Sequence, residues 1–276
     1  MNFTIKEFIS LRDFIYQRTG LFYEEKKIFF IKKRLIERMK KTEATSPLDY
    51  LRFLKFSDPN GIEFQEFVNL ITTNETYFFR EFDQLACFAE DCLPDVISRK
   101  PAFGFRNLKI WCAACSSGEE AYTLAIIMKA MLLEEETDWH CRILATDIDQ
   151  NILARAEAGV YDERSVKDMP DEYLQKYMKA SPRGYRVAPA VKELVTFEHL
   201  NFMDRAAMRG MRDFDFIFCR NALIYFDDIS RKEVVNHFYN ALTPKGFIYL
   251  GHAESMGRIS TKFKLRRYGK NMVYQK

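Results

Sequence analysis

The chain has 276 residues, enough for one large domain or two smaller ones, and its 47% hydrophobic and 29% charged content is ordinary for a soluble globular protein. A net charge of +3 argues against a nucleic-acid-binding protein that relies on bulk charge, although it allows a local basic face. No apolar run is long enough for a membrane span and no signal segment follows Met1, so we expect a cytoplasmic protein without membrane insertion.

Residues 1–70 are predicted to form an all-α N-terminal domain. A capping box at Thr4-Ile5-Lys6-Glu7 opens the first helix, and Ser46-Pro47 supplies the N-cap and the first-turn proline of the third. The turn Asp58-Pro59-Asn60-Gly61 precedes the fourth. The expected helices run from Thr4 to Gly20, from Tyr23 to Thr42, from Ser46 onward and from Ile62 to Leu70.

Residues 71–100 are expected to form a linker followed by the first helix of a catalytic domain, from Glu81 to Ser98. From Leu108 onward strands and helices alternate, which predicts a parallel sheet with helices on both faces. The expected strands are Leu108 to Ala113, Arg142 to Thr146, Val195 to Leu200, Phe214 to Cys219 and Gly246 to Gly251. The expected helices are Glu119 to Leu133, Asp149 to Ala158 and Ser230 to Ala241, before a hairpin of Phe263 to Tyr268 and Met272 to Tyr274.

The stretch from about residue 161 to 194 does not fit a single crossover helix. Its turn Ser181-Pro182-Arg183-Gly184, followed by Tyr185-Arg186-Val187, predicts a small antiparallel β-subdomain beside a helix from Asp171 to Met178. Residues 101–276 are therefore predicted to form an α/β, Rossmann-like domain that carries this subdomain.

The most informative motif is the stretch from Ile110 to Tyr122. An apolar strand breaks into a turn of small residues before Gly118, which lets the backbone pass close to a ligand, and Glu119 and Glu120 then open a helix. Glu119 and Glu120 occupy the start of this helix, where a phosphate-binding loop has only backbone N–H groups. The expected ligand therefore carries positive charge. S-adenosylmethionine, with its ribose, ammonium and sulfonium, fits this demand better than a dinucleotide does.

Asp147 ends the next predicted strand, where acids in dinucleotide-type folds bind ribose hydroxyls. Its alternative role is that of an N-cap, which Asp149 can fill instead. Glu119 and Glu120 also have a structural alternative, because a helix dipole stabilises acids in the first turn. Arg80, between Phe79 and Phe82, can bind a carboxylate in fork geometry.

Trp111-Cys112-Ala113-Ala114-Cys115 has a rival interpretation as a thioredoxin-type redox site. The chain is too long for that fold alone, and the second strand ends in acids instead of leading to a proline loop. A metal site is not expected, because no second cysteine pair or histidine pair stands at ligand spacing. His252 is expected to be a structural histidine.

Five motifs in order along the chain together resemble the chemotaxis receptor methyltransferases, the CheR-type enzymes. The motifs are Thr72 to Glu81, Trp111 to Glu120, Ala145 to Asp149, Phe218 to Phe226 and Gly251 to Ser255. The resemblance implies transfer of a methyl group from S-adenosylmethionine to glutamate side chains of the cytoplasmic signalling helices of chemoreceptors, with S-adenosylhomocysteine as the other product.

The resemblance also implies roles for individual residues. Arg80 and Tyr225 would lie nearest the transferred methyl group and are the catalytic candidates. Besides Gly118 of the small-residue loop, the cofactor-binding residues would be Asn74, Thr76, Arg80, Glu120, Asp147, Asn201, Phe202, Cys219 and Arg220. Partner binding would fall to the basic second helix, through Lys32, Lys33, Arg34 and Arg38.

Some members of this family bind a tethering pentapeptide of the receptor tail with a glycine-rich turn of the β-subdomain. Here the turn holds only Gly184, so direct docking is expected instead of tether binding. No nucleic-acid partner is expected. Two alternatives stay open: a non-catalytic adaptor that binds S-adenosylmethionine, and a methyltransferase that acts on RNA.

Overall fold

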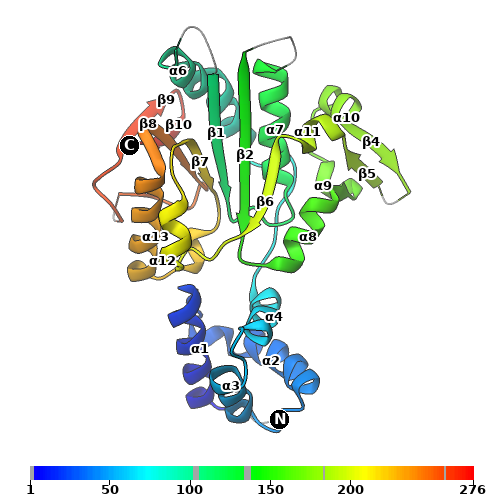
Figure 1. Ribbon diagram of the computed structural model, residues 1–276, viewed down its shortest axis with the longest axis vertical. Coiled ribbons are helices and arrows are strands. Elements are labelled where there is room, and N and C mark those ends of the chain that lie inside the picture. The colour runs from blue at the N-terminus through cyan, green and yellow to red at the C-terminus, as the bar shows by residue number, and fades with distance from the viewer. Residues whose placement is uncertain (1–2, 102–105, 134–137, 183, 258) are drawn as a thin grey trace.

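The computed structural model describes residues 3–101, 106–133, 138–182, 184–257 and 259–276. A helical N-terminal domain lies below a central sheet, and the parallel strands of the sheet point toward it (Figure 1). The predicted fold class is confirmed, with an all-α domain followed by an α/β domain that carries a second, smaller sheet. Within the described ranges, no helix combines the length and the apolar character that crossing a membrane requires.

The N-terminal domain begins as its capping signals predict. The Thr4 hydroxyl accepts from the backbone N–H of Glu7, the Glu7 carboxylate accepts from the N–H of Thr4, and Gly20 ends the helix in the left-handed region with a φ of 71°. The helices are α1 (Ile5–Thr19), α2 (Ile28–Thr42), α3 (Pro47–Phe56) and α4 (Ile62–Ile71).

The second helix begins later than predicted. Residues Glu25–Lys27 form a short 3₁₀ turn, η1, and Leu21 makes an isolated β-bridge with Phe226 of the α/β domain. The Tyr23 hydroxyl donates to the carbonyl oxygen of Ile71 at the end of α4. These contacts hold the segment before η1 in an extended form, so apolar spacing alone overestimated the helix.

The long helix expected from Glu81 to Ser98 is present in three parts. It comprises α5 (Phe82–Cys87), a π-helical turn η2 (Phe88–Cys92) and α6 (Leu93–Ser98). Pro94 lies in the first turn of α6, where its missing N–H and its ring oppose the regular α-helical hydrogen bond to the preceding turn. The wide π turn accommodates this proline without breaking the helix.

The main sheet has seven strands in the order β6-β2-β1-β7-β8-β10-β9. The strands are β1 (Arg106–Ala113), β2 (Trp139–Asp147), β6 (Val195–His199), β7 (Phe214–Cys219), β8 (Leu242–Leu250), β9 (Lys264–Tyr268) and β10 (Asn271–Gln275). The first five are parallel, and the β9–β10 hairpin adds an antiparallel edge. The chain reverses its direction of travel across the sheet between β1 and β7, where open α/β sheets bind their ligands.

Helices α7 (Glu119–Leu132), α8 (Gln150–Ala158), α12 (Arg205–Gly210) and α13 (Asp228–Ala241) connect the parallel strands. A small antiparallel sheet, β3-β5-β4, follows α8 as predicted. Its elements are β3 (Val160–Tyr161), α9 (Glu163–Val166), α10 (Asp171–Tyr177), β4 (Met178–Ser181), β5 (Gly184–Val187) and α11 (Pro189–Lys192).

The predicted turn of this subdomain includes Arg183, which lies outside the described residues. Gly184 has a φ of 111°, and a Cβ there would stand 2.2 Å from the carbonyl oxygen of Tyr161. The close approach of β5 to β3 therefore requires this glycine.

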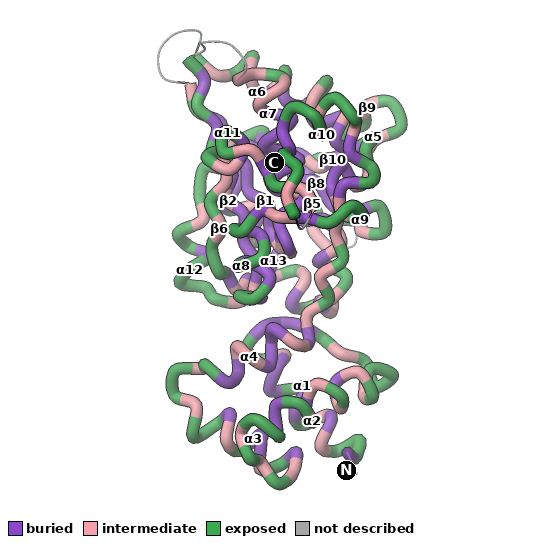
Figure 2. The backbone as a smooth tube through the Cα atoms, turned by 90° about the vertical axis from the view of Figure 1, so that its right-hand side faces the viewer, coloured by how far each residue is buried: buried purple, intermediate pink, exposed green. Residues whose placement is uncertain are grey.

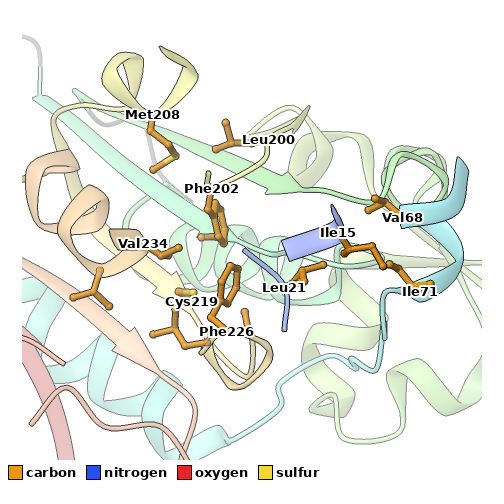
Figure 3. Packing of buried hydrophobic residues seen from close by; sticks show 14 of the residues in the cluster. Ile15, Leu21, Val68, Ile71, Leu200, Phe202, Met208, Cys219, Phe226 and Val234 are labelled. Atoms are coloured by element: carbon orange, nitrogen blue, oxygen red, sulfur yellow. The ribbon is translucent and has the colours of Figure 1, made fainter. Parts of the chain in front are cut away.

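Alternate residues of each parallel strand face opposite sides of the sheet and form two cores. Trp111 and Ile217 belong to one cluster, whereas Ile110 and Phe216 belong to the other. Buried stretches fill the interior of the α/β body and exposed residues cover its outside (Figure 2). The first cluster continues into the N-terminal domain, where Ile15, Leu21, Val68 and Ile71 lie on the same side of the sheet as Phe202 and Phe226 (Figure 3).

Candidate active site

A cavity of about 230 Å³ opens at the carboxyl ends of β1, β2 and β7, between the sheet and the N-terminal domain. Its walls come from α1 and the segment after it, the linker after α4, the loop after β1, and the ends of β2, β6 and β7. Predicted site residues that line it are Asn74, Thr76, Arg80, Glu120, Asp147, Asn201, Phe202, Arg220 and Tyr225. Residues far apart in the sequence are thus brought to the edge of the sheet at which they were expected to meet.

Gly118 and Cys219, also predicted to bind the cofactor, are not among the lining residues. Gly118 has a φ of 92°, and a Cβ there would stand 2.9 Å from the Cβ of Ala156 in α8. Cys219 is fully buried at the end of β7, in the apolar cluster that includes Phe226 and Val234 (Figure 3). Both residues support the cavity from behind, because tight packing of α7 and β7 leaves their atoms no access to it.

The loop after β1 folds around the carboxylate of Asp147. Ala114, Ser116 and Gly118 all adopt positive φ, which brings the backbone N–H of Ser116 to 2.8 Å from Asp147 Oδ2. The backbone N–H of Asp149 donates to Oδ1 at 3.0 Å. Burial nevertheless raises the pKa of Asp147 to about 6. The two backbone hydrogen bonds therefore fix the carboxylate in place, and the raised pKa means that it is protonated at mildly acidic pH.

Asp149 fills the capping role that the sequence had left open between the two acids. Its Oδ1 accepts from the N–H groups of Asn151 and Ile152 at the start of α8. Its Oδ2 accepts from Thr72 Oγ1 at 2.8 Å and from Asn74 Nδ2 at 2.7 Å. The linker is thereby tied to the end of β2, and Asp147 is left to line the cavity.

Arg220 is buried beside the cavity between two carboxylates. Its Nη1 donates to Glu120 Oε1 at 2.8 Å, and its Nη2 lies 3.0 Å from Glu81 Oε2. Nη2 also donates to the carbonyl oxygen of Arg80 at 2.6 Å. Two carboxylates against one guanidinium leave an excess of negative charge in a poorly solvated place, which favours a cationic ligand.

The cysteine pair shows no sign of redox chemistry. Cys112 and Cys115 are free and buried, and Cys112 Sγ donates to Glu120 Oε2 at 3.2 Å. Burial raises the pKa of both thiols well above the usual range, so that the reactive thiolate is disfavoured. Both cysteines instead pack in the buried apolar cluster on one side of the sheet.

Arg80 and Tyr225 are half-buried and line the same cavity. Arg80 donates through Nη1 to the carbonyl oxygen of Glu75 at 3.0 Å, and its guanidinium stands 5.7 Å from the centre of the Tyr77 ring. Tyr225 ends a short 3₁₀ turn, η3 (Leu223–Tyr225), and its carbonyl oxygen accepts from the N–H of Phe22 at 2.9 Å. A cation and a phenol are thus both presented to the cavity.

The N-terminal domain contributes a wall of the cavity that the sequence analysis missed. Thr19, Leu21 and Tyr23 line it. Asn201 Nδ2 donates to the carbonyl oxygen of Arg18 at 2.6 Å, which joins the end of α1 to the loop after β6. No local pattern signals this wall, because the spacing around residue 20 indicates only the end of a helix.

The predicted docking helix needs a correction at Arg38. This side chain is buried at 6% exposure, and it donates to the carboxylates of Glu63 and Glu66 in α4. Arg34 is half-buried over the ring of Phe30 and donates to the carbonyl oxygen of Leu70 at 3.2 Å. Arg38 therefore holds the helical domain together and does not face a partner. Lys33 is exposed and Lys32 is partly exposed.

The lining fits S-adenosylmethionine. Asp147, Ile148, Leu200 and Phe202 line the cavity. Asp147 would accept hydrogen bonds from the ribose hydroxyls, and the three apolar side chains would contact the adenine ring. Ser116 Oγ is buried and has no hydrogen-bond partner in the described part of the chain, which leaves a polar group for a ligand. The negative excess around Arg220 suits the ammonium and the sulfonium.

Comparison with known proteins agrees with this fit. Residues 74–271 match the family model described as CheR methyltransferase, SAM binding domain, and residues 6–72 match CheR methyltransferase, all-alpha domain. Chemotaxis protein methyltransferase 2 of Vibrio cholerae is 41% identical over 99% of this chain and 93% of its own length. The chemotaxis protein methyltransferase of Borreliella burgdorferi is 33% identical over 93% of this chain and 90% of its own. The chain therefore belongs to the CheR family of chemotaxis methyltransferases, which use S-adenosylmethionine as the methyl donor.

Proposed function

We propose that this protein transfers the methyl group of S-adenosylmethionine to glutamate side-chain carboxylates of chemoreceptor signalling helices in the cytoplasm. The products would be glutamate methyl esters and S-adenosylhomocysteine. One observation carries the proposal: the cavity that presents Asp147 and Glu120 to a cationic donor also presents Arg80 and Tyr225 to an anionic acceptor. The names of the relatives support the chemotactic role.

The chemistry asks for positioning and needs no strong base. A glutamate side chain, with an ordinary pKa of about 4.3, is already ionised at neutral pH. Bound S-adenosylmethionine supplies an electrophilic methyl group on a sulfonium. Arg80 would bind the acceptor carboxylate through guanidinium donors other than the Nη1 that Glu75 engages, and the Tyr225 hydroxyl would donate a second hydrogen bond.

The surroundings of the cavity should also favour reaction. Leu21, Ile71 and Phe226 line it with apolar surface and limit the access of water. Opposite charges on acceptor and donor are neutralised on the way to the transition state. Poor solvation therefore destabilises the separated charges more than the transition state.

The proposal is tested with S-adenosylmethionine labelled on its methyl group and with receptor-containing membranes. We expect label in the receptor that is released by alkali, as an ester requires, and that persists after nuclease treatment. Label in RNA would identify the RNA methyltransferase. Binding of the cofactor without any transfer would identify the adaptor.

Tyr225 is tested in the same assay with the Tyr225→Phe variant. We expect kcat to fall at least tenfold while the Kd for S-adenosylhomocysteine stays within threefold. Tyr239→Phe is the matched control, because Tyr239 is a half-buried tyrosine that packs on Phe263 and does not line the cavity. An unchanged kcat for Tyr225→Phe would remove this residue from the mechanism.

We further propose that the receptor helix docks directly on the N-terminal domain, with Lys32 and Lys33 of α2 facing its acidic side. Support comes from the exposure of Lys33 and the partial exposure of Lys32, on a helix whose two arginines, Arg34 and Arg38, are used inside the domain. Capture of a tethering pentapeptide by the small sheet is not part of this proposal. Gly184, the one glycine of its turn, is needed for the contact with Tyr161.

A further inference from the structure

The loop that carries Tyr225 follows β7 and has little regular structure of its own. It runs from Arg220 to Phe226, and η3 is its one short helical turn. Asn221 adopts a left-handed conformation with a φ of 59°, which an asparagine tolerates better than most residues but which must still be held by its surroundings. The backbone groups of the loop are bonded by two charged side chains from outside it.

Glu254 binds the N–H groups of the loop. Its Oε2 accepts from the N–H of Asn221 at 2.8 Å and from that of Gly251 at 2.8 Å, and its Oε1 accepts from the N–H of Ile224 at 3.2 Å. One carboxylate therefore joins the loop to the end of β8. The join is tight, because a Cβ at Gly251 would stand 2.6 Å from Asn221 Nδ2.

Arg231 of α13 binds carbonyl groups of the same loop. Its Nε donates to the carbonyl oxygen of Leu223 at 3.0 Å, and its Nη2 donates to that of Phe226 at 2.6 Å. Glu254 thus accepts from the N–H groups of the loop while Arg231 donates to its carbonyl groups. The loop also forms the Leu21–Phe226 bridge and the Phe22–Tyr225 hydrogen bond. Hydrogen bonds to charged groups are roughly twice as strong as neutral ones, so Glu254 and Arg231 are the strongest of the contacts that define its shape.

We propose that Glu254 and Arg231 are positioning residues, which act on methyl transfer by holding the Asn221–Phe226 loop in the shape that presents Tyr225 to the acceptor. Neither residue lines the cavity in the described structure, so each acts through the loop and touches neither donor nor acceptor. The inference rests on the proposed function, because it assigns Tyr225 to the acceptor side.

The test measures kcat for receptor methylation and the Kd for S-adenosylhomocysteine in Glu254→Gln and Arg231→Gln. Glutamine keeps the size of Glu254 but turns an NH₂ group toward at least one backbone N–H. We expect kcat to fall at least tenfold in each variant while Kd stays within threefold. Asp58→Asn is the control and should keep full activity, because the Asp58 carboxylate also accepts two backbone N–H groups but lies in the N-terminal domain.

A double-mutant cycle with Tyr225→Phe separates positioning from a general loss of stability. If Glu254 acts through Tyr225, Glu254→Gln lowers kcat by less than threefold once the Tyr225 hydroxyl is absent. Multiplicative losses in the cycle, an unchanged kcat in folded Glu254→Gln, or a Kd that rises in parallel would overturn the inference. If Glu254→Gln fails to fold by circular dichroism, Arg231→Gln answers the question in the same cycle.

The failure of this inference is distinguishable from that of the proposed function. If the wild-type protein labels the receptor, and the Glu254→Gln and Arg231→Gln variants label it equally fast, only the positioning role is overturned. A wild-type protein that transfers no label to any receptor overturns both.

Discussion

We predict that the carboxylate of Asp147, as the proposed ligand of the ribose, makes cofactor binding dependent on pH. Burial raises the pKa of Asp147 to about 6 in the cofactor-free protein. Ribose hydroxyls donate to a carboxylate, so the cofactor selects the ionised form. At pH 5, one unit below this pKa, about one molecule in eleven carries the charge, and we expect the apparent Kd to be about tenfold higher than at pH 8.

Protonation of Asp147 does not weaken cofactor binding at pH 5 by unfolding the protein. The pKa of Asp147 in the folded protein lies above the ordinary value of 3.8. Between about pH 6 and 3.8 the folded state therefore binds a proton that the unfolded chain lacks, and this group stabilises the cofactor-free fold as the pH falls. Weaker binding at pH 5 would reflect the loss of charge at Asp147.

Calorimetric titration with S-adenosylhomocysteine at pH 5, 6, 7 and 8 measures the dependence, in the wild type and in Asp147→Asn. At pH 8 the variant loses a hydrogen bond to a charged group, about 1.5–3 kcal/mol or roughly 10- to 150-fold in Kd. Its Kd should then vary little with pH. A flat wild-type profile, or a variant that keeps the wild-type dependence, would refute the assignment. Asp162→Asn, which alters the cap of α9, is the control and should bind normally.

Three further predictions concern the N-terminal domain and the loop after β1. Arg38→Met leaves Glu63 buried without its cation and should lower the free energy of unfolding by about 3–5 kcal/mol, measured by urea denaturation; a loss below 1 kcal/mol would contradict the buried pair. Lys32→Glu with Lys33→Glu should raise the KM for receptor and make it less sensitive to salt, while the Kd for S-adenosylhomocysteine stays unchanged; equal KM values would exclude docking there. Gly118→Ala should lower the thermal midpoint by several degrees, because a Cβ would stand 2.9 Å from the neighbouring helix at a positive φ, and an unchanged midpoint would contradict the packing.

Much of the fold could be predicted from local signals. The capping box at Thr4, the N-cap at Ser46 and the proline at position 47 specify helix starts through contacts between residues a few positions apart. The alternation of strands and helices after Leu108 predicted the parallel sheet. The start of α2 could not be predicted, since a bridge between Leu21 and Phe226 sets it across about two hundred residues.

The candidate site was predictable only in part. Asp147, Glu120 and Arg220 stand at strand ends or helix starts, so their meeting at one edge follows from the direction of parallel strands. The pairing of Glu120 with Arg220 does not follow, because it depends on how far the loop after β7 reaches over α7.

The sequence by itself determined most of the helices and strands, although not the start of α2, and it determined which acids and small residues stand at the turns of the sheet. Periodicity and capping are properties of near neighbours, and the chain carries them wherever it folds. The tertiary structure alone decided that Thr19, Leu21 and Tyr23 close the cavity, that Arg38 is buried against Glu63, and that Gly118 and Cys219 lie behind the wall. Packing between segments distant in sequence settles these matters, and a one-dimensional pattern does not record which surfaces meet.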